Sequence, residues 1–317
     1  MDKQAPLPIA TLTLNPCLDV SYEFSNLVPD QKVRADHTRF DPGGNGTNVG
    51  RALKKLGLPA MNCCILAGEI GSLVERLLGD QLDNLQAIQM AGETRINCAI
   101  FEKEPPVQYE IDGIGPNVEP ETLEQVVNSF LEGAQSGIGV LSGSLPAGVP
   151  VEIYGDLVER LRERDAKAVV DAKGPILEHA LSHHPFLIKP NRYELEILCG
   201  HKLSSLSAVV KEGRRLQQQG VTYICVSLGG EGAILVGPKD IYHVKAPQVP
   251  VYSTVGAGDS LVTGLVAAFA RGQDPVDALR LGICCGSGTA QNPGTGLFTH
   301  EDIEDLTKSV EVHRLDT

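Results

Sequence analysis

The chain is 317 residues long and 42% of its residues are hydrophobic, which is enough to bury one large core or two smaller ones. It carries 27 basic and 40 acidic side chains, a net charge of −13, and this excess of acid argues against a protein that covers nucleic-acid phosphates with a basic face. Any anionic substrate would have to meet basic residues that are placed locally.

The eight cysteines lie mostly within apolar runs and form no C-x-x-C pair. This pattern favours buried thiols over zinc ligands and is typical of a reducing compartment. No apolar run approaches the ~18 residues of a membrane span, and no signal peptide precedes the first predicted strand. We therefore expect a cytoplasmic protein that contacts neither membrane nor nucleic acid.

The first third of the chain mixes buried strands with half-polar ones. Apolar runs predict buried strands over residues 9–14 and 61–67. Apolar residues at helical spacing follow the glycine-rich loop at residues 41–46, and a further helix is predicted over residues 73–78. Alternating patterns predict strands that are exposed on one face over residues 20–24, 32–40, 94–101 and 107–111.

From about residue 120 the pattern becomes a regular alternation of helices and strands. Helices are predicted over residues 121–131 and 152–161, from residue 192 onward, and over residues 206–216. Strands are predicted over residues 138–141, 168–171, 186–189 and 223–227. Repeated strand–helix units require a mainly parallel sheet covered on both faces. The half-polar strands do not fit that layer, so we expect them to form a small separate sheet that acts as a lid.

A second glycine-rich loop, at residues 253–260, opens onto a predicted helix. The first N–H groups of a helix lack intrahelical partners, so they can hold developing negative charge while Asp259 takes a proton from a nucleophile. This is chemistry suited to phosphoryl transfer. Taken alone, the same residues could equally form a turn and a helix cap.

Polar residues gather where the predicted strands end, which is where open α/β sheets bind ligands. They are Asp19, residues 43–48, Ser144, Asp171, residues 189–194, residues 227–229 and Asp259. The loop at Gly44 is no dinucleotide fingerprint, because Val49 stands where the third glycine should be, and no Walker A sequence occurs. A bound nucleotide would need another geometry.

Four motifs resemble the signatures of the ribokinase-like sugar kinases, and within them the phosphofructokinase-B branch. They lie in order at residues 42–49 (PGGNGTNV), 142–146 (SGSLP), 189–195 (KPNRYEL) and 254–260 (TVGAGDS), and the resemblance runs from about residue 9 to 300. It implies a three-layer α/β/α fold with a mainly parallel central sheet and a small β lid. We expect one kinase domain over residues 1–317, with a discontinuous lid from about 16–40 and 92–113.

The resemblance also implies an ATP-dependent kinase that uses Mg²⁺. Asp259 matches the catalytic base, and Gly256, Ala257 and Gly258 match the anion hole. Further positions match residues that bind ATP, the phosphoryl donor. Lys189 would contact the ATP phosphates, and Asn191 and Glu194 would hold a water-coordinated Mg²⁺. Ser227, Gly229 and Gly232 would form a nucleotide loop, and Asn292 would lie near the adenine. Ser253, Val255, Asn292 and Gly294 resemble a potassium site, although Gly296 replaces a longer side chain there.

On the acceptor side, the matching positions that bind sugar hydroxyls are Asp19, Gly43, Gly44 and Asn48, with Ser144 at a neighbouring strand end. Arg95, Lys32 and Arg34 are candidates for the phosphate already on the sugar, because a guanidinium fork suits phosphate oxygens. Lys32 and Arg34 alternate on one predicted strand and could instead face water. In the resembling 6-phosphofructokinases one lid completes the partner's site, so a homodimer through the lid is expected.

The exact sugar stays open between fructose-6-phosphate and other phosphosugars. Asn45 stands where 1-phosphofructokinases and tagatose-6-phosphate kinases usually carry lysine, which favours fructose-6-phosphate, whereas residues 94–97 and 189–196 look more like 1-phosphofructokinases. An inactive sugar-phosphate-binding regulator would not need Asp259 together with Asn191 and Glu194. A kinase for unphosphorylated sugars or nucleosides would leave Arg95 and Lys32 without a purpose.

Overall fold

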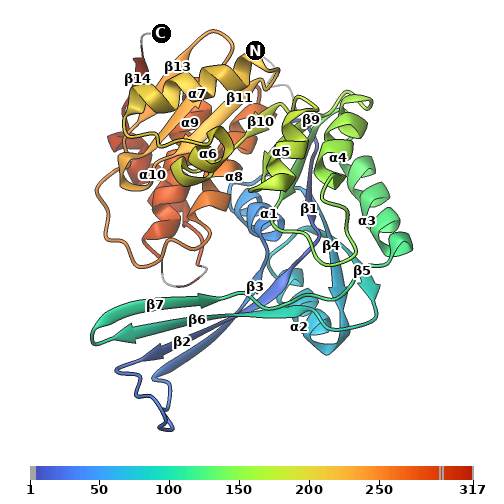
Figure 1. Ribbon diagram of the computed structural model, residues 1–317, viewed down its shortest axis with the longest axis vertical. Coiled ribbons are helices and arrows are strands. Elements are labelled where there is room, and N and C mark those ends of the chain that lie inside the picture. Colours follow the sequence, from blue (N-terminus) through green and yellow to red (C-terminus); the bar gives the residue numbers. More distant parts are fainter. Residues whose placement is uncertain (1–4, 293, 295, 316–317) are drawn as a thin grey trace.

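The fold is a large twisted sheet between two layers of helices, with a second sheet projecting from one side (Figure 1). The computed structural model describes residues 5–292, 294 and 296–315. The strands of the large sheet are, in spatial order, β14 (Val312–Leu315), β13 (Ile241–Val244), β12 (Ala233–Val236), β11 (Tyr223–Ser227), β10 (Leu187–Ile188), β9 (Lys167–Asp171), β8 (Ile138–Ser142), β1 (Ile9–Thr13), β4 (Met61–Ala67) and β5 (Asn84–Met90). Neighbouring strands from β5 to β11 are parallel, and β12 to β14 are added antiparallel.

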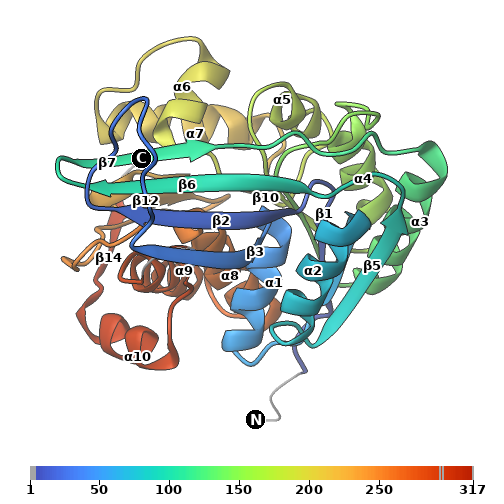
Figure 2. The same cartoon turned by 90° about the horizontal axis from the view of Figure 1, so that it is seen from below.

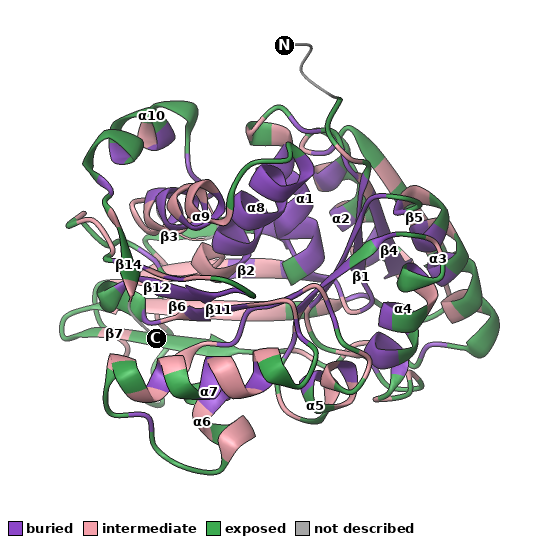
Figure 3. Cartoon of the chain, turned by 90° about the horizontal axis from the view of Figure 1, so that it is seen from above, coloured by how far each residue is buried: buried purple, intermediate pink, exposed green. Residues whose placement is uncertain are grey.

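Helices cover both faces of this sheet, as Figure 3 shows from above. One layer contains α1 (Asn45–Lys55), α2 (Gly68–Gly79), α8 (Ala257–Ala270), α9 (Pro275–Ala290) and α10 (His300–Ser309). The other contains α3 (Pro120–Gly133), α4 (Ile153–Arg162), α5 (Pro175–Leu181), α6 (Arg192–Cys199) and α7 (Leu206–Gln218). Each layer has its own apolar core, and α8 is buried along nearly its whole length because α1, α9 and the sheet surround it.

The close packing of α8 on α9 depends on two glycines. A Cβ built at Gly264 of α8 would lie 2.5 Å from the Cα of Gly282 in α9, so no larger residue fits without moving backbone. The two helices therefore meet through their backbones.

The small sheet consists of β3 (His37–Gly43), β2 (Cys17–Phe24), β6 (Arg95–Lys103) and β7 (Pro106–Ile111), in that order. Figure 2 shows the four strands side by side across one end of the molecule. Leu18 and Val20 of β2 pack against α2 and so anchor this sheet to the body. We call it the lid from here on.

The sequence-based boundaries need one correction with consequences for the site. The predicted strand at residues 32–40 begins only at His37 and continues to Gly43, so Lys32 and Arg34 lie in the connection between β2 and β3. The reason is that β2 ends at Phe24 and offers no partner beyond the pair Glu23 and His37. Pro42 is tolerated within β3 because β3 is an edge strand.

Other predicted elements are confirmed, and some were missed. β1, β4, β8, β9 and β11 and helices α1 to α4 and α6 to α8 lie where the patterns predict them, while β10 is shorter than predicted. The structure adds the elements β5, α5, β12, β13, α9, α10 and β14 and a 3₁₀ turn at Gly229–Glu231. The expectation of a mainly parallel sheet with a small second sheet is confirmed.

Candidate active site

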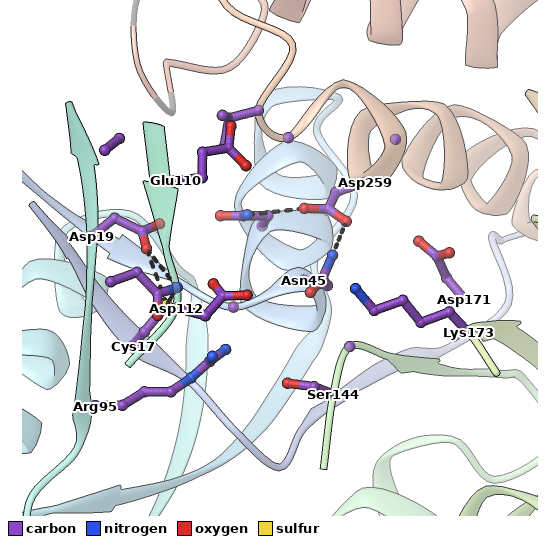
Figure 4. Close-up of a pocket in the computed structure, with 18 of the residues that line it drawn as sticks. Cys17, Asp19, Asn45, Arg95, Glu110, Asp112, Ser144, Asp171, Lys173 and Asp259 are labelled. Atoms are coloured by element: carbon purple, nitrogen blue, oxygen red, sulfur yellow. Dashed lines mark hydrogen bonds between the residues drawn. The ribbon is translucent and has the colours of Figure 1, made fainter. Parts of the chain in front are cut away.

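Two cavities meet at the N-terminus of α8. One, of about 390 Å³, lies between the lid, the start of α1 and the carboxyl ends of the parallel strands (Figure 4). The other, of about 340 Å³, lies between the α8–α9 pair, the 3₁₀ turn and residues 246–251. Gly258 lines both cavities, so a group held in one can reach a group held in the other across the first turn of α8.

Asp259 follows Gly258 and lines the first cavity as a buried carboxylate. Asn45 Nδ2 donates a hydrogen bond to its Oδ1 and Asn48 Nδ2 donates one to its Oδ2, each at 2.9 Å. Burial, followed by the nearby Asp171 carboxylate, raises the pKa of Asp259 to about 7, although the two amide hydrogen bonds and Lys189 oppose this shift. A carboxylate with that pKa can accept a proton near neutral pH and release it again.

The backbone before Asp259 forms the predicted anion-holding turn. Gly256 caps α8 in the left-handed conformation, with φ of 76°, where a side chain would be strained. Ala257 and Gly258 begin the helix, and the N–H groups of a first turn have no partners within the helix. Together with the helix dipole, these groups favour an anion at this end.

Lys189 lies at the end of β10 beside Asp171, the last residue of β9. Their Nζ and Oδ1 atoms are 3.1 Å apart and both side chains are nearly buried. Burial alone would lower the pKa of Lys189, but the carboxylates of Asp171, Glu194 and Asp259 together raise it. The Lys189 ammonium therefore stays charged and is already paired with Asp171.

Lys173, two residues after β9, is a second cation of the cavity. Figure 4 shows its side chain extended into the cavity towards Asn45. Within the described part of the chain its ammonium makes no hydrogen bond or ion pair, in contrast to Lys189. An anionic group bound between Asn45 and Asp171 would meet this free charge.

The predicted sugar-side residues come together on the lid and the start of α1. Asp19 accepts hydrogen bonds from Cys17 Sγ at 3.1 Å and Asn97 Nδ2 at 3.2 Å, and burial raises its pKa. Gly43 lies directly against this carboxylate, since a Cβ built there would be 2.2 Å from Asp19 Oδ2. The lining of the cavity includes Asp19, Gly44, Asn48, Arg95 and Ser144.

Arg95 is held at the lid edge of the cavity. Its Nε and Nη2 donate to the Asn15 carbonyl at 3.2 and 3.0 Å, and Asn15 Nδ2 donates to Ser144 Oγ at 3.1 Å. Figure 4 places Glu110 and Asp112 on the same side, so this end of the cavity carries more acid than base. A sugar phosphate bound here needs further positive charge.

Lys32 and Arg34 do not supply that charge within this chain. Both side chains are exposed in the connection between β2 and β3, and neither lines the cavity, contrary to their predicted place on a strand facing the substrate. The lid arginine nearest to them in sequence that forms an ion pair on β3 is Arg39, whose Nε lies 2.6 Å from Asp41 Oδ2.

Asn191 and Glu194 form a capping box at the start of α6. Glu194 N donates to Asn191 Oδ1 at 2.8 Å, and Asn191 N donates to Glu194 Oε2 at 2.9 Å. Glu194 also lines the cavity, whereas Asn191 does not. No cluster of three or more metal-ligating side chains is present among the described residues. Of the predicted magnesium pair, Glu194 is thus the residue that faces the cavity, and a divalent ion held there would keep most of its own water.

The residues predicted to bind the nucleotide and potassium do not all line the same cavity. Ser227, Gly229 and Gly232 line the second cavity, as expected for a nucleotide loop. Asn292 lines neither cavity, and its amide donates to the Gly288 carbonyl at 2.9 Å. Ser253 is buried and accepts from Val255 N at 3.2 Å, whereas Val255 and Gly294 line the first cavity.

Several lining residues were given no role by the sequence. Lys173, Asn97, Glu110 and Asp112 were missed, and Asn45 was weighed only as a mark of substrate class. Lys173 follows the predicted strand at residues 168–171, which is a usable signal. The acidic pair could not be placed, because the pairing of β7 with β6 brings it over the cavity.

The comparisons with known proteins agree with this geometry. The family model described as "pfkB family carbohydrate kinase" matches residues 10–302, and the chain belongs to this family. It is 31% identical to a 1-phosphofructokinase of Bacillus subtilis (strain 168) over 307 residues, 97% of this chain and 100% of the relative. It is 32% identical to the ATP-dependent 6-phosphofructokinase isozyme 2 of Escherichia coli (strain K12) over 300 residues, 94% of this chain and 97% of the relative.

The solved structures give the same answer. The crystal structure of phosphofructokinase-2 from Escherichia coli in complex with substrates and products has a TM-score of 0.92 at 31% identity, covering 96% of this chain and 99% of that chain. The predicted ribokinase-like fold is confirmed. The protein is an ATP-dependent sugar kinase of the phosphofructokinase type. Its described helices include none that is both long and apolar enough to span a membrane.

Proposed function

We propose that the protein transfers the γ-phosphoryl group of ATP to a hydroxyl of fructose-6-phosphate, giving fructose-1,6-bisphosphate, with Asp259 as general base. The observation that carries this proposal is the environment of Asp259, which lines the first cavity beside Gly258, is buried and held by two amides, and has its pKa raised to about 7. A hydroxyl bound over Asp259 would lose its proton to the carboxylate as it attacks the phosphorus atom.

The cavity at the α8–α9 pair would hold the nucleoside, and its shape supports that assignment. Its walls carry apolar side chains from Val249, Val251, Leu261 and Ile283, with glycines on the 3₁₀ turn. Flat apolar walls suit an aromatic base, and glycine backbone lets the phosphates approach closely. The phosphates would then lead over Gly258 to the N-terminus of α8.

The charges around the junction suit phosphoryl transfer. The first-turn N–H groups of α8 would steady the phosphoryl oxygens, and Lys189 and Lys173 would add positive charge from the opposite side. Hydrated Mg²⁺ at Asn191 and Glu194, of which Glu194 faces the cavity, would neutralise phosphate charge when bound. Ser253, Val255, Asn292 and Gly294 remain our proposed potassium site, and one similar solved structure is titled as a complex with potassium.

The choice of sugar rests on the acceptor side. Relatives named for fructose-1-phosphate and fructose-6-phosphate chemistry are 31% and 32% identical, so overall identity does not separate them. Asn45 in place of the usual lysine favours fructose-6-phosphate, and its amide holds Asp259. Fructose-1-phosphate and tagatose-6-phosphate are the alternative substrates.

We further propose that the lid forms a homodimer interface in a single-domain enzyme of the cytoplasm. The lid face turned away from the cavity is apolar, with Phe40, Ile96 and Tyr109 between 44% and 53% exposed. Pairing two such faces would bury them and carry Lys32 and Arg34 towards the partner's acidic cavity edge. All eight cysteines are free, in support of the proposed compartment.

The deciding experiment compares kcat/KM for fructose-6-phosphate, fructose-1-phosphate and tagatose-6-phosphate in a coupled assay of ADP release. Unphosphorylated fructose serves as the control for the need of the sugar phosphate. We expect the highest value for fructose-6-phosphate. A preference for fructose-1-phosphate would replace the proposed substrate, and no ADP release with any sugar would point to an inactive regulator.

A further inference from the structure

The orientation of the Asn48 amide is set by a buried arginine behind it. Arg51 follows Asn48 by one turn of α1 and is 5% exposed. Its Nη1 donates to Asn48 Oδ1 at 2.9 Å and to the Pro42 carbonyl at 3.2 Å. Its Nε donates to Gln81 Oε1 at 2.7 Å, so the guanidinium is fixed from two further elements.

The chemistry of the two neighbours leaves Asn48 a single orientation. A guanidinium has donors only, so the amide atom that faces Arg51 must be the oxygen. The amide nitrogen then has to face Asp259, where it donates to Oδ2 at 2.9 Å. Among the described contacts no cation hydrogen-bonds to Asn45 Oδ1, so the hydrogen bond to Asp259 alone sets the orientation of that amide.

We infer that Arg51 is a positioning residue for catalysis, which keeps the Asn48 N–H aimed at Asp259 and so keeps this carboxylate ionised as a base. This inference rests on the proposed function of Asp259. Without Arg51 the amide could turn its oxygen to Asp259, an arrangement that suits only the protonated acid. The relay runs from Gln81 through Arg51 and Asn48 to Asp259.

Charges on the surrounding elements bear on both ends of this relay. Burial lowers the pKa of Arg51, and the nearby Arg39 lowers it further. The carboxylates of Asp41, Asp19 and Asp259 oppose this shift, and the guanidinium stays charged throughout. Asp259 itself faces Asp171 from β9 and Lys189 from the end of β10. Replacing Arg51 leaves Asp171 and Lys189 in place, so their effect on Asp259 is common to the wild type and the variant.

The test is the pH profile of kcat/KM with the preferred hexose phosphate for Arg51→Met. We expect the acid limb to move upward by about one pH unit, so that activity falls about fivefold at pH 7 and about tenfold at lower pH, and recovers at high pH. Arg271→Met is the matched control: Arg271 Nη2 donates to the Leu56 carbonyl at the other end of α1 but does not contact Asn48. It should leave the limb unmoved.

A second variant keeps the test decisive if Arg51→Met does not fold. Gln81→Leu removes the acceptor of Arg51 Nε and should shift the limb in the same direction by less. Suppose that Asp259→Asn is inactive but the acid limb stays at the wild-type pH in every folded variant of Arg51 or Gln81. That result overturns the positioning role of Arg51 and leaves the proposed base intact. Full turnover by Asp259→Asn instead overturns the proposed base.

Discussion

The two sides of the first cavity differ in how firmly one chain holds their functional side chains in place. On the α8 side, Asp259, Asn48 and Lys189 are buried and held by hydrogen bonds or an ion pair at 2.9 to 3.1 Å. On the lid side, Arg95 is tied to a carbonyl and the exposed Lys32 lies away from the cavity. The residues proposed for the chemical step are thus held in place by the core, whereas sugar-phosphate recognition would depend on a second copy of the chain if the proposed lid dimer forms.

The largest expected effect is on the core side. Asp259→Asn removes the proton acceptor but keeps the shape of the side chain, so kcat should fall by about 10²–10⁴-fold while sugar-phosphate binding is nearly unchanged. Steady-state kinetics with calorimetric titration of the sugar phosphate would measure both. An unchanged kcat would contradict the assignment of the base.

Lys173 tests whether the free cation acts on the transferring group. Lys173→Met should lower kcat by about 10- to 100-fold with a smaller change in KM, because the charge is needed most in the transition state. Lys167→Met is the matched control, since Lys167 starts the same strand, β9, and lies over the Phe186 ring at 5.0 Å. Equal losses in the two variants would argue against a catalytic role for Lys173.

The proposed role of the lid can be tested by disrupting the proposed lid dimer. Phe40→Asp places a charge on the apolar lid face, so it should give a monomer in light scattering and raise KM for fructose-6-phosphate about tenfold. Lys32→Ala should raise KM similarly in the dimer. If the partner's lid supplies Lys32, the double variant should be no worse than Phe40→Asp alone. Independent, multiplying effects would contradict a shared site.

The smallest expected effect is on stability, and it depends on pH. The pKa of Asp259 is raised to about 7 in the folded protein, above its ordinary value, so the native state binds the proton more tightly than the unfolded chain and loses stability as pH rises towards 7. Relative to wild type, Asp259→Asn should therefore gain about 3 kcal/mol between pH 5 and pH 8. Urea unfolding at both pH values measures this, and a gain that does not vary with pH would contradict the raised pKa.

Local patterns predicted much of the core side. The glycines and Asp259 are neighbours in sequence, and Asn191 and Glu194 are one helical turn apart, so their arrangement follows from a helix start alone. The pairing of Asn45 with Asp259 spans 214 residues, and no periodicity reveals it. Lys32 was misplaced because the start of β3 is decided by where its partner strand β2 ends.

The backbone contact between Gly264 and Gly282 limits how this kinase could be redesigned for other phosphoryl donors. The two helices joined there provide Leu261, Ile283 and Gly286 to one wall of the cavity that we propose holds the nucleotide. Because backbone already touches backbone, that wall cannot be moved inward, and moving it outward would open the core beneath. A change of donor base would have to come from the opposite wall at residues 246–251, which no helix packing constrains in this way.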